Sequence, residues 1–76
     1  MHVGDPPEAP LATAERKVRE SEDRIARQLS LILLLERDCQ WREARAARRV
    51  LEGFQRGLGL AWERLQLERW AHDRGR

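Results

Sequence analysis

The sequence predicts an all-α fold, an antiparallel two-helix hairpin, from three observations. Apolar residues recur every three or four positions in two separate stretches, which is the spacing of one face of an α-helix. No glycine or proline interrupts the first stretch, from Leu11 to Asp38. The apolar stripe changes phase between Leu35 and Ala44, so one straight helix would carry its two halves on opposite sides. A hairpin brings both halves face to face.

Residues 1–10 are predicted to form a disordered, proline-rich tail. They contain all three prolines of the chain. Pro10 suits the first position of a helix, because the N–H group that it lacks would have no partner there. The first helix is therefore expected over residues 11–38, where pairs such as Glu20 and Arg24 contribute about 0.2–0.5 kcal/mol each.

The second helix is expected over residues 42–72, with residues 73–76 as a frayed C-terminus. Between the helices the turn falls at Asp38–Trp41, and this alignment predicts a contact between Ile25 and Phe54. The turn contains no glycine, the residue that most often takes the left-handed conformation after a helix. A bent continuous helix is the alternative. The residues of the predicted seam are Val18, Ile25, Ile32, Leu35, Leu51, Phe54, Leu58 and Leu65.

Composition limits the function. A chain of 76 residues with 15 Lys plus Arg against 13 Asp plus Glu forms one small domain with a thin core. It offers no nucleophile motif and no glycine-rich phosphate loop, so we expect a protein that is not an enzyme. We also expect no cofactor and no metal, because His2 and His72 have no partner at metal-ligand spacing.

Cys39 is the single cysteine, so the chain cannot form an intramolecular disulfide. This is compatible with a reducing compartment, and we expect a cytoplasmic protein. The longest apolar-rich run, Leu29 to Leu35, is far shorter than the roughly 20 residues that span a bilayer, so no transmembrane segment is expected. Cys39 is expected to be an exposed turn residue; a reactive thiol is the alternative.

Several runs resemble a family of short, uncharacterised bacterial helical-hairpin proteins. They include residues 14–18 (Ala-Glu-Arg-Lys-Val), 21–28 (Ser-Glu-Asp-Arg-Ile-Ala-Arg-Gln) and 35–38 (Leu-Glu-Arg-Asp), with Glu43-Ala44-Arg45 and the spacing Leu51, Phe54, Leu58 and Leu60. The resemblance spans most of residues 11–65. It implies a two-helix fold and no particular chemistry. Family members carry a glycine after the Leu-Glu-Arg-Asp run, where this chain has Cys39.

Apolar residues outside the seam predict a surface for a partner, because contiguous exposed apolar patches usually mark contact sites. We expect self-association, with two hairpins pairing into a four-helix bundle, or docking on a helical partner protein. The candidate partner surface is Leu29, Leu33, Leu34, Leu60, Trp62, Leu67 and Trp70.

An arginine stripe on the second helix supports a nucleic-acid-binding alternative, because arginines on one side of a helix can contact phosphates. The small net charge of +2 speaks against it. A third possibility is attachment to an anionic membrane surface. The candidate nucleic-acid contacts are Arg42, Arg45, Arg49 and Arg56.

Overall fold

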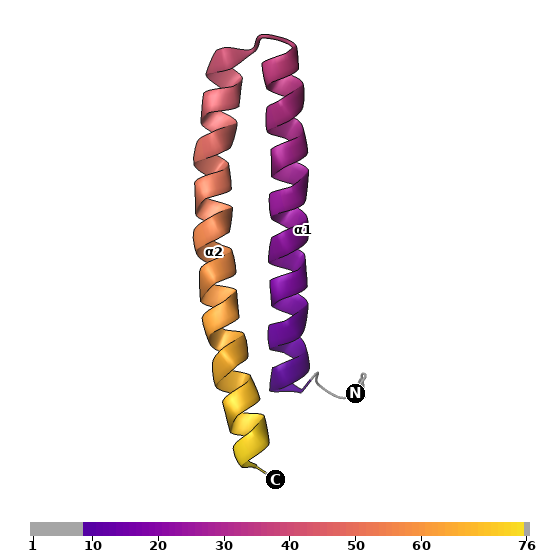
Figure 1. The fold of residues 1–76 in the computed structure, drawn as a ribbon, viewed down its shortest axis with the longest axis vertical. Coiled ribbons are helices and arrows are strands. Elements are labelled where there is room, and N and C mark those ends of the chain that lie inside the picture. The colour runs from indigo at the N-terminus through magenta and orange to yellow at the C-terminus, as the bar shows by residue number, and fades with distance from the viewer. Residues whose placement is uncertain (1–8, 76) are drawn as a thin grey trace, which may run out of the picture.

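The computed structural model describes residues 9–75 and contains two antiparallel helices, α1 (Pro10–Arg37) and α2 (Trp41–Arg74) (Figure 1). The two helices pack against each other over their length, which confirms the all-α hairpin. The smallest extent of the molecule is 14 Å, little more than the diameter of one helix. Each helix can therefore bury only the side that faces its neighbour. Most of the predicted proline-rich tail, residues 1–8, lies outside the described residues.

Helix α1 begins at Pro10, one residue before the predicted start. Ala9 is the N-cap, and its carbonyl accepts a hydrogen bond from the Thr13 N–H at 2.9 Å. No side chain caps this end. Pro10 occupies the first helical position, where its fixed φ fits the helix and its lack of an N–H leaves no donor unsatisfied.

The turn contains no glycine, and Cys39 takes the conformation that glycine usually adopts at this position. Cys39 adopts a φ of 58°, the left-handed conformation that non-glycine residues rarely take. The N–H of Gln40 donates to the Leu35 carbonyl at 2.8 Å, and the N–H of Cys39 donates to the Glu36 carbonyl at 3.0 Å. These two bonds form a Schellman motif, the arrangement that usually places glycine at this position. The turn thus satisfies two carbonyls at the end of α1 and reverses the chain.

Helix α2 is longer than expected at both ends. Trp41 belongs to the helix, which corrects its placement in the turn, because the Gln40 carbonyl already accepts the Ala44 N–H at 2.9 Å. At the other end Asp73 and Arg74 are helical, although residues 73–76 were expected to be frayed. The Gly75 N–H donates to the carbonyls of Ala71 and His72 at 3.0 and 3.3 Å. These bonds extend the last turn by two residues.

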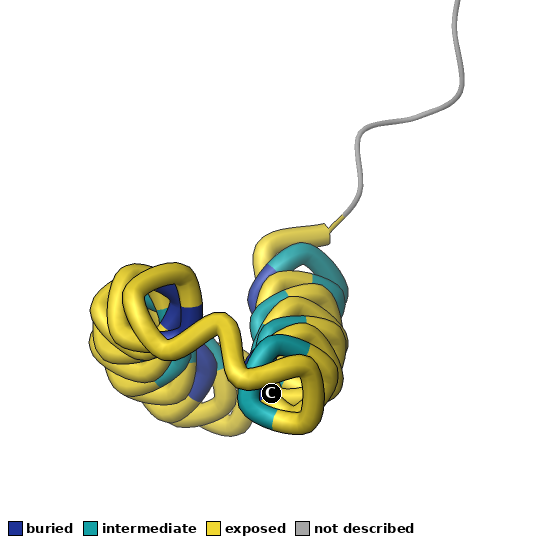
Figure 2. Tube along the Cα trace, turned by 90° about the horizontal axis from the view of Figure 1, so that it is seen from above, coloured by how far each residue is buried: buried dark blue, intermediate teal, exposed yellow. Residues whose placement is uncertain are grey.

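The core lies along the facing sides of the two helices, and the outer sides are exposed (Figure 2). At the open end of the hairpin, away from the turn, Ala14, Val18 and Leu65 form a buried apolar cluster. Leu11, Leu58 and Ala61 pack against this cluster. Nearer the turn, the buried residues are Ile32, Ala44 and Ala47.

Two polar contacts join the helices in the half nearer the turn. Gln28 Nε2 donates to the backbone carbonyl of Ala47 at 2.8 Å, in a partly buried position. Glu36 and Arg48 form an ion pair between the helices. Gln28 therefore occupies a seam position as a hydrogen-bond donor, which explains a polar residue there.

Candidate interaction surface

All eight residues predicted for the seam are buried or half-buried. Val18, Ile32 and Leu65 are buried, and the other five are half-buried. Val18 and Leu65 meet in the apolar cluster, with Leu58 packed against them. Ile25 and Phe54 are both half-buried, and their contact remains a prediction. The Phe54 ring is partly covered by the guanidinium of Arg24, which lies 5.7 Å from the ring centre.

The apolar residues predicted to meet a partner are all exposed, with accessible fractions between 39% and 66%. They do not form a single surface. The ion pair of Glu36 and Arg48 bridges the helices on one face of the hairpin. A shallow groove lined by Lys17 and Arg64 marks the opposite face. The 3.6-residue period then assigns these exposed residues, except Trp70, to one face or the other.

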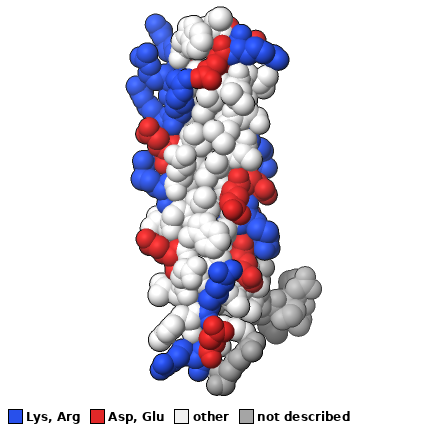
Figure 3. Space-filling view, viewed as in Figure 1, with Lys and Arg blue, Asp and Glu red and all other residues white. Residues whose placement is uncertain are grey.

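The first face, which we call the tryptophan face, contains Trp41 and Trp62 on α2 and Leu29 and Leu33 on α1. Trp41, Arg48 and Trp62 are separated by multiples of seven residues, as are the seam residues Ala44, Leu51 and Leu58, so they follow a line beside the seam. Figure 3 shows this face, with uncharged surface along the middle of its upper part, charged side chains along its edges, and charged side chains also across its lower part. The full line on α2 is Trp41, Arg48, Gln55, Trp62 and Arg69.

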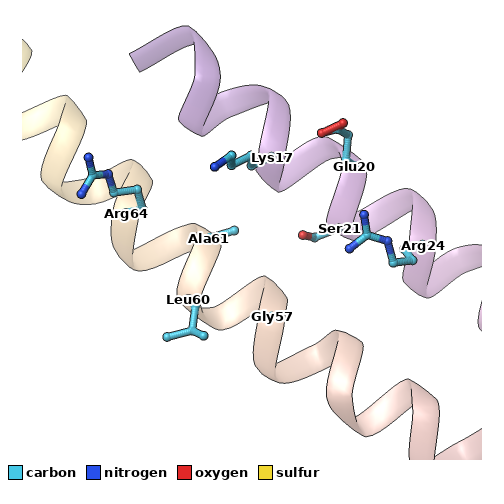
Figure 4. A pocket seen from close by; sticks show the side chains of 8 residues that line it. All are labelled: Lys17, Glu20, Ser21, Arg24, Gly57, Leu60, Ala61 and Arg64. Carbon is cyan, nitrogen blue, oxygen red and sulfur yellow. The ribbon is translucent and has the colours of Figure 1, made fainter. Parts of the chain in front are cut away.

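The opposite face, called the back face, contains aliphatic residues and the groove shown in Figure 4. Ser21, Gly57 and Ala61 are small residues along the groove, and Lys17, Arg24 and Arg64 supply its positive charge. A Cβ atom added at Gly57 would meet nothing within 4 Å, so packing of the hairpin does not require a glycine there. The exposed aliphatic residues of this face are Leu31, Leu34, Val50, Leu60 and Leu67.

Trp70 belongs to neither face. Its ring is exposed on the outer side of α2, with the guanidinium of Arg74 lying 5.1 Å from the ring centre. It lines an open depression on α2 together with Glu63, Gln66 and Leu67. This depression lies on a single helix and has no wall from α1, so it is a flat surface feature.

The four arginines proposed for nucleic-acid contact are all exposed on the outer side of α2. None of them forms an ion pair within residues 9–75. Lys and Arg side chains gather along the α2 edge near the turn (Figure 3). Arg42, Arg45 and Arg49 lie within two turns of helix, whereas Arg56 lies two turns further on.

Within residues 9–75 no group of three or more His, Cys, Asp or Glu side chains is placed to hold a metal ion. Cys39 is exposed and forms no disulfide. Across the described part of the chain, neither helix includes a stretch apolar enough to pass through a lipid bilayer.

The predicted partner surface omits three of the exposed large apolar residues, namely Leu31, Trp41 and Val50. The predicted turn includes Trp41, so the prediction does not place Trp41 on the same side of the second helix as Arg48 and Trp62. Val50 directly precedes the seam residue Leu51, and Leu31 directly precedes Ile32. Their positions next to seam residues could have indicated that they are exposed, because two helices alone leave both sides of the seam uncovered.

Comparison of the chain with protein-family models, curated proteins and solved structures finds no match.

Proposed function

We propose that this protein acts by association: a non-enzymatic helical hairpin that binds a second copy or another helical surface through its exposed apolar residues. The observation that carries the proposal is the thinness of the core. Among the described residues no large side chain is less than 2% exposed, whereas ten large apolar side chains are at least 39% exposed. Monomers rarely leave so much apolar surface in water without a partner.

Energetics supports the same conclusion. Within residues 9–75, half of the six buried residues are alanines, whose burial removes little apolar surface from water. Ordering a helical residue costs about 1.5 kcal/mol in conformational entropy. Pairing two hairpins into a four-helix bundle would add a second buried layer without ordering more backbone. The exposed single cysteine is compatible with a cytoplasmic location, which is part of the proposal.

Sedimentation equilibrium combined with far-UV circular dichroism over a dilution series tests the proposal. We expect a mass above the monomer at micromolar concentration and a helix content that falls on dilution. A stable helical monomer at every concentration would contradict self-association and leave docking on a different protein.

The clustered arginines on the α2 edge favour one second candidate, binding to nucleic acid. Unpaired, exposed arginines release counterions when they contact phosphates, and each contact contributes about 0.9 to the slope of log affinity against log salt. Changing Arg42, Arg45, Arg49 and Arg56 to Gln should then abolish salt-sensitive binding to DNA or RNA. Binding that survives these changes would exclude the arginine edge as the contact.

A further inference from the structure

We propose that a second copy of the chain docks antiparallel on the tryptophan face, with Trp41 and Trp62 of each copy against Arg69 and Arg48 of the other. The inference rests on the proposed self-association and specifies its surface and direction.

When two copies of α2 lie antiparallel, the line on one copy is complementary to the same line on the other. The line consists of Trp41, Arg48, Gln55, Trp62 and Arg69. The two tryptophans are 21 residues apart, and so are the two arginines. Both intervals correspond to about 32 Å along a helix. When two copies run antiparallel about Gln55, both tryptophans of each copy therefore face arginines of the other in one register. Gln55 meets Gln55 of the second copy at the centre.

The chain already uses arginine against aromatic rings. Phe54 lies under Arg24 and Trp70 lies beside Arg74, at 5.7 and 5.1 Å from ring centre to guanidinium carbon. Within residues 9–75, by contrast, no cation lies over Trp41 or Trp62, although these side chains are exposed. Two of the four aromatic rings thus lack the partner that the other two have. A guanidinium over a tryptophan ring is the strongest pairing of this type.

The arginines on the line remain accessible. The Arg69 side chain is exposed and forms no ion pair within the described residues. Arg48 pairs with Glu36, but its side chain is still 49% exposed. A planar guanidinium can pair with a carboxylate through its edge and stack on a ring through its face. The internal ion pair would therefore hold Arg48 in position for the second copy.

The dimensions of the tryptophan face suit a dimer. A helix of 28 residues, the length of α1, extends about 42 Å, and two helices packed 8–10 Å apart present a face about 20 Å wide. The projected area is about 800 Å² per copy, the size of a standard protein interface. The back face is the same size, but Lys17, Arg24 and Arg64 line its groove against one acid, Glu20. Two back faces would bring these positive charges together.

Crosslinking of the full-length chain tests the register, in a Cys39→Gly background that removes the native thiol. Gln55→Cys should crosslink to its copy under mild oxidation or with a short thiol-specific reagent, because the proposed two-fold axis passes beside it. Arg56→Cys is the matched control, since its side chain lies on the outer edge of α2. We expect at least tenfold less crosslinked dimer for Arg56→Cys. Equal yields, or none from Gln55→Cys, would overturn this docking face.

Sedimentation equilibrium of the same proteins separates the two proposals. A dimer mass without the Gln55→Cys crosslink would overturn the register and leave self-association intact. A monomer mass at all concentrations would overturn both.

Truncating the ring at Trp62 tests the arginine contacts directly. Trp62→Ala should raise the dimer dissociation constant at least tenfold, as expected for a tryptophan at the centre of a contact. Trp70→Ala removes a ring outside the face and should leave the constant unchanged. Equal effects of the two changes would contradict the role assigned to Trp62.

Discussion

At the open end of the hairpin Val18 and Leu65 are 4% and 2% exposed within an apolar cluster, whereas near the turn the most buried residue is Ala44, at 0%. At the open end, two of the three buried residues in the cluster are therefore branched aliphatic, and the third is Ala14. Near the turn, two of the three buried residues are alanines, the third is Ile32, and a hydrogen bond and an ion pair cross between the helices. The same hairpin thus combines a segment of apolar packing with a segment of buried alanines and polar contacts.

This difference indicates which kind of substitution should destabilise each half of the hairpin. The open end depends on filling space, since a buried Leu or Val contributes about 1.5–3 kcal/mol. Near the turn, Ala44 and Ala47 are 0% and 6% exposed, so a larger side chain at either position would have to displace its neighbours. Replacing large by small should damage the first half, and replacing small by large should damage the second.

The largest expected effect is at the open end. Leu65→Ala should lower the free energy of unfolding by about 2–5 kcal/mol, because it leaves a cavity in the apolar cluster. Urea unfolding followed by far-UV circular dichroism measures the change. Variants must be compared at one protein concentration, because association alters apparent stability. A loss below about 1 kcal/mol would mean that the open end does not depend on packing as described.

Overpacking near the turn should have the next largest effect. Ala44→Leu inserts three heavy atoms at a position with no exposed surface, and we expect a loss of about 1–3 kcal/mol. Ala46→Leu, on an exposed position of the same helix, is the matched control and should be nearly neutral. If both variants unfold at the same urea concentration, Ala44 is not as tightly packed as its lack of exposed surface indicates.

The polar contact of the same half is expected to contribute less. Gln28→Ala should cost about 0.5–1.5 kcal/mol, the net value of one hydrogen bond in a folded protein. Thermal unfolding at fixed concentration detects this change. Gln66→Ala, at an exposed position of α2 outside the proposed dimer line, is the control for loss of a glutamine from a helix. A loss at Gln28 no greater than at Gln66 would show that the bond to Ala47 contributes nothing.

Stability should increase when the turn receives glycine. Cys39→Gly removes the side chain that disfavours a φ of 58°, so we expect a gain of about 1 kcal/mol. Cys39→Ala keeps a Cβ atom and should give no gain. The two variants are compared by urea unfolding under reducing conditions. A destabilised Cys39→Gly protein would mean that the cysteine side chain itself supports the turn.

The smallest expected effect is on the outer edge of α2. Arg49 is exposed, as predicted, and Arg49→Ala should change the free energy of unfolding by less than about 0.5 kcal/mol. This variant sets the baseline for the unfolding comparisons above. A larger loss would indicate that the edge makes a contact in an assembled form of the protein.

Particular residues show how far sequence reasoning reached. The apolar period predicted both helices to within two residues at each end, and the seam residues are buried or half-buried. The same period could not divide the exposed apolar residues between two faces, because that division depends on which sides of the helices meet. Phe54, a predicted seam residue, is only half-buried beneath Arg24.

The sequence by itself determined the helices, the break between them and the stripe that each one buries. These follow from local periodicity, since the spacing of apolar residues sets the sides that avoid water. The tertiary structure alone decided that Cys39 takes a left-handed conformation, that Trp41 starts α2, and that Gln28 donates to Ala47. Each of these depends on where the second helix lies relative to the first. Helix packing and the closing of the turn outweigh the local preferences of single residues.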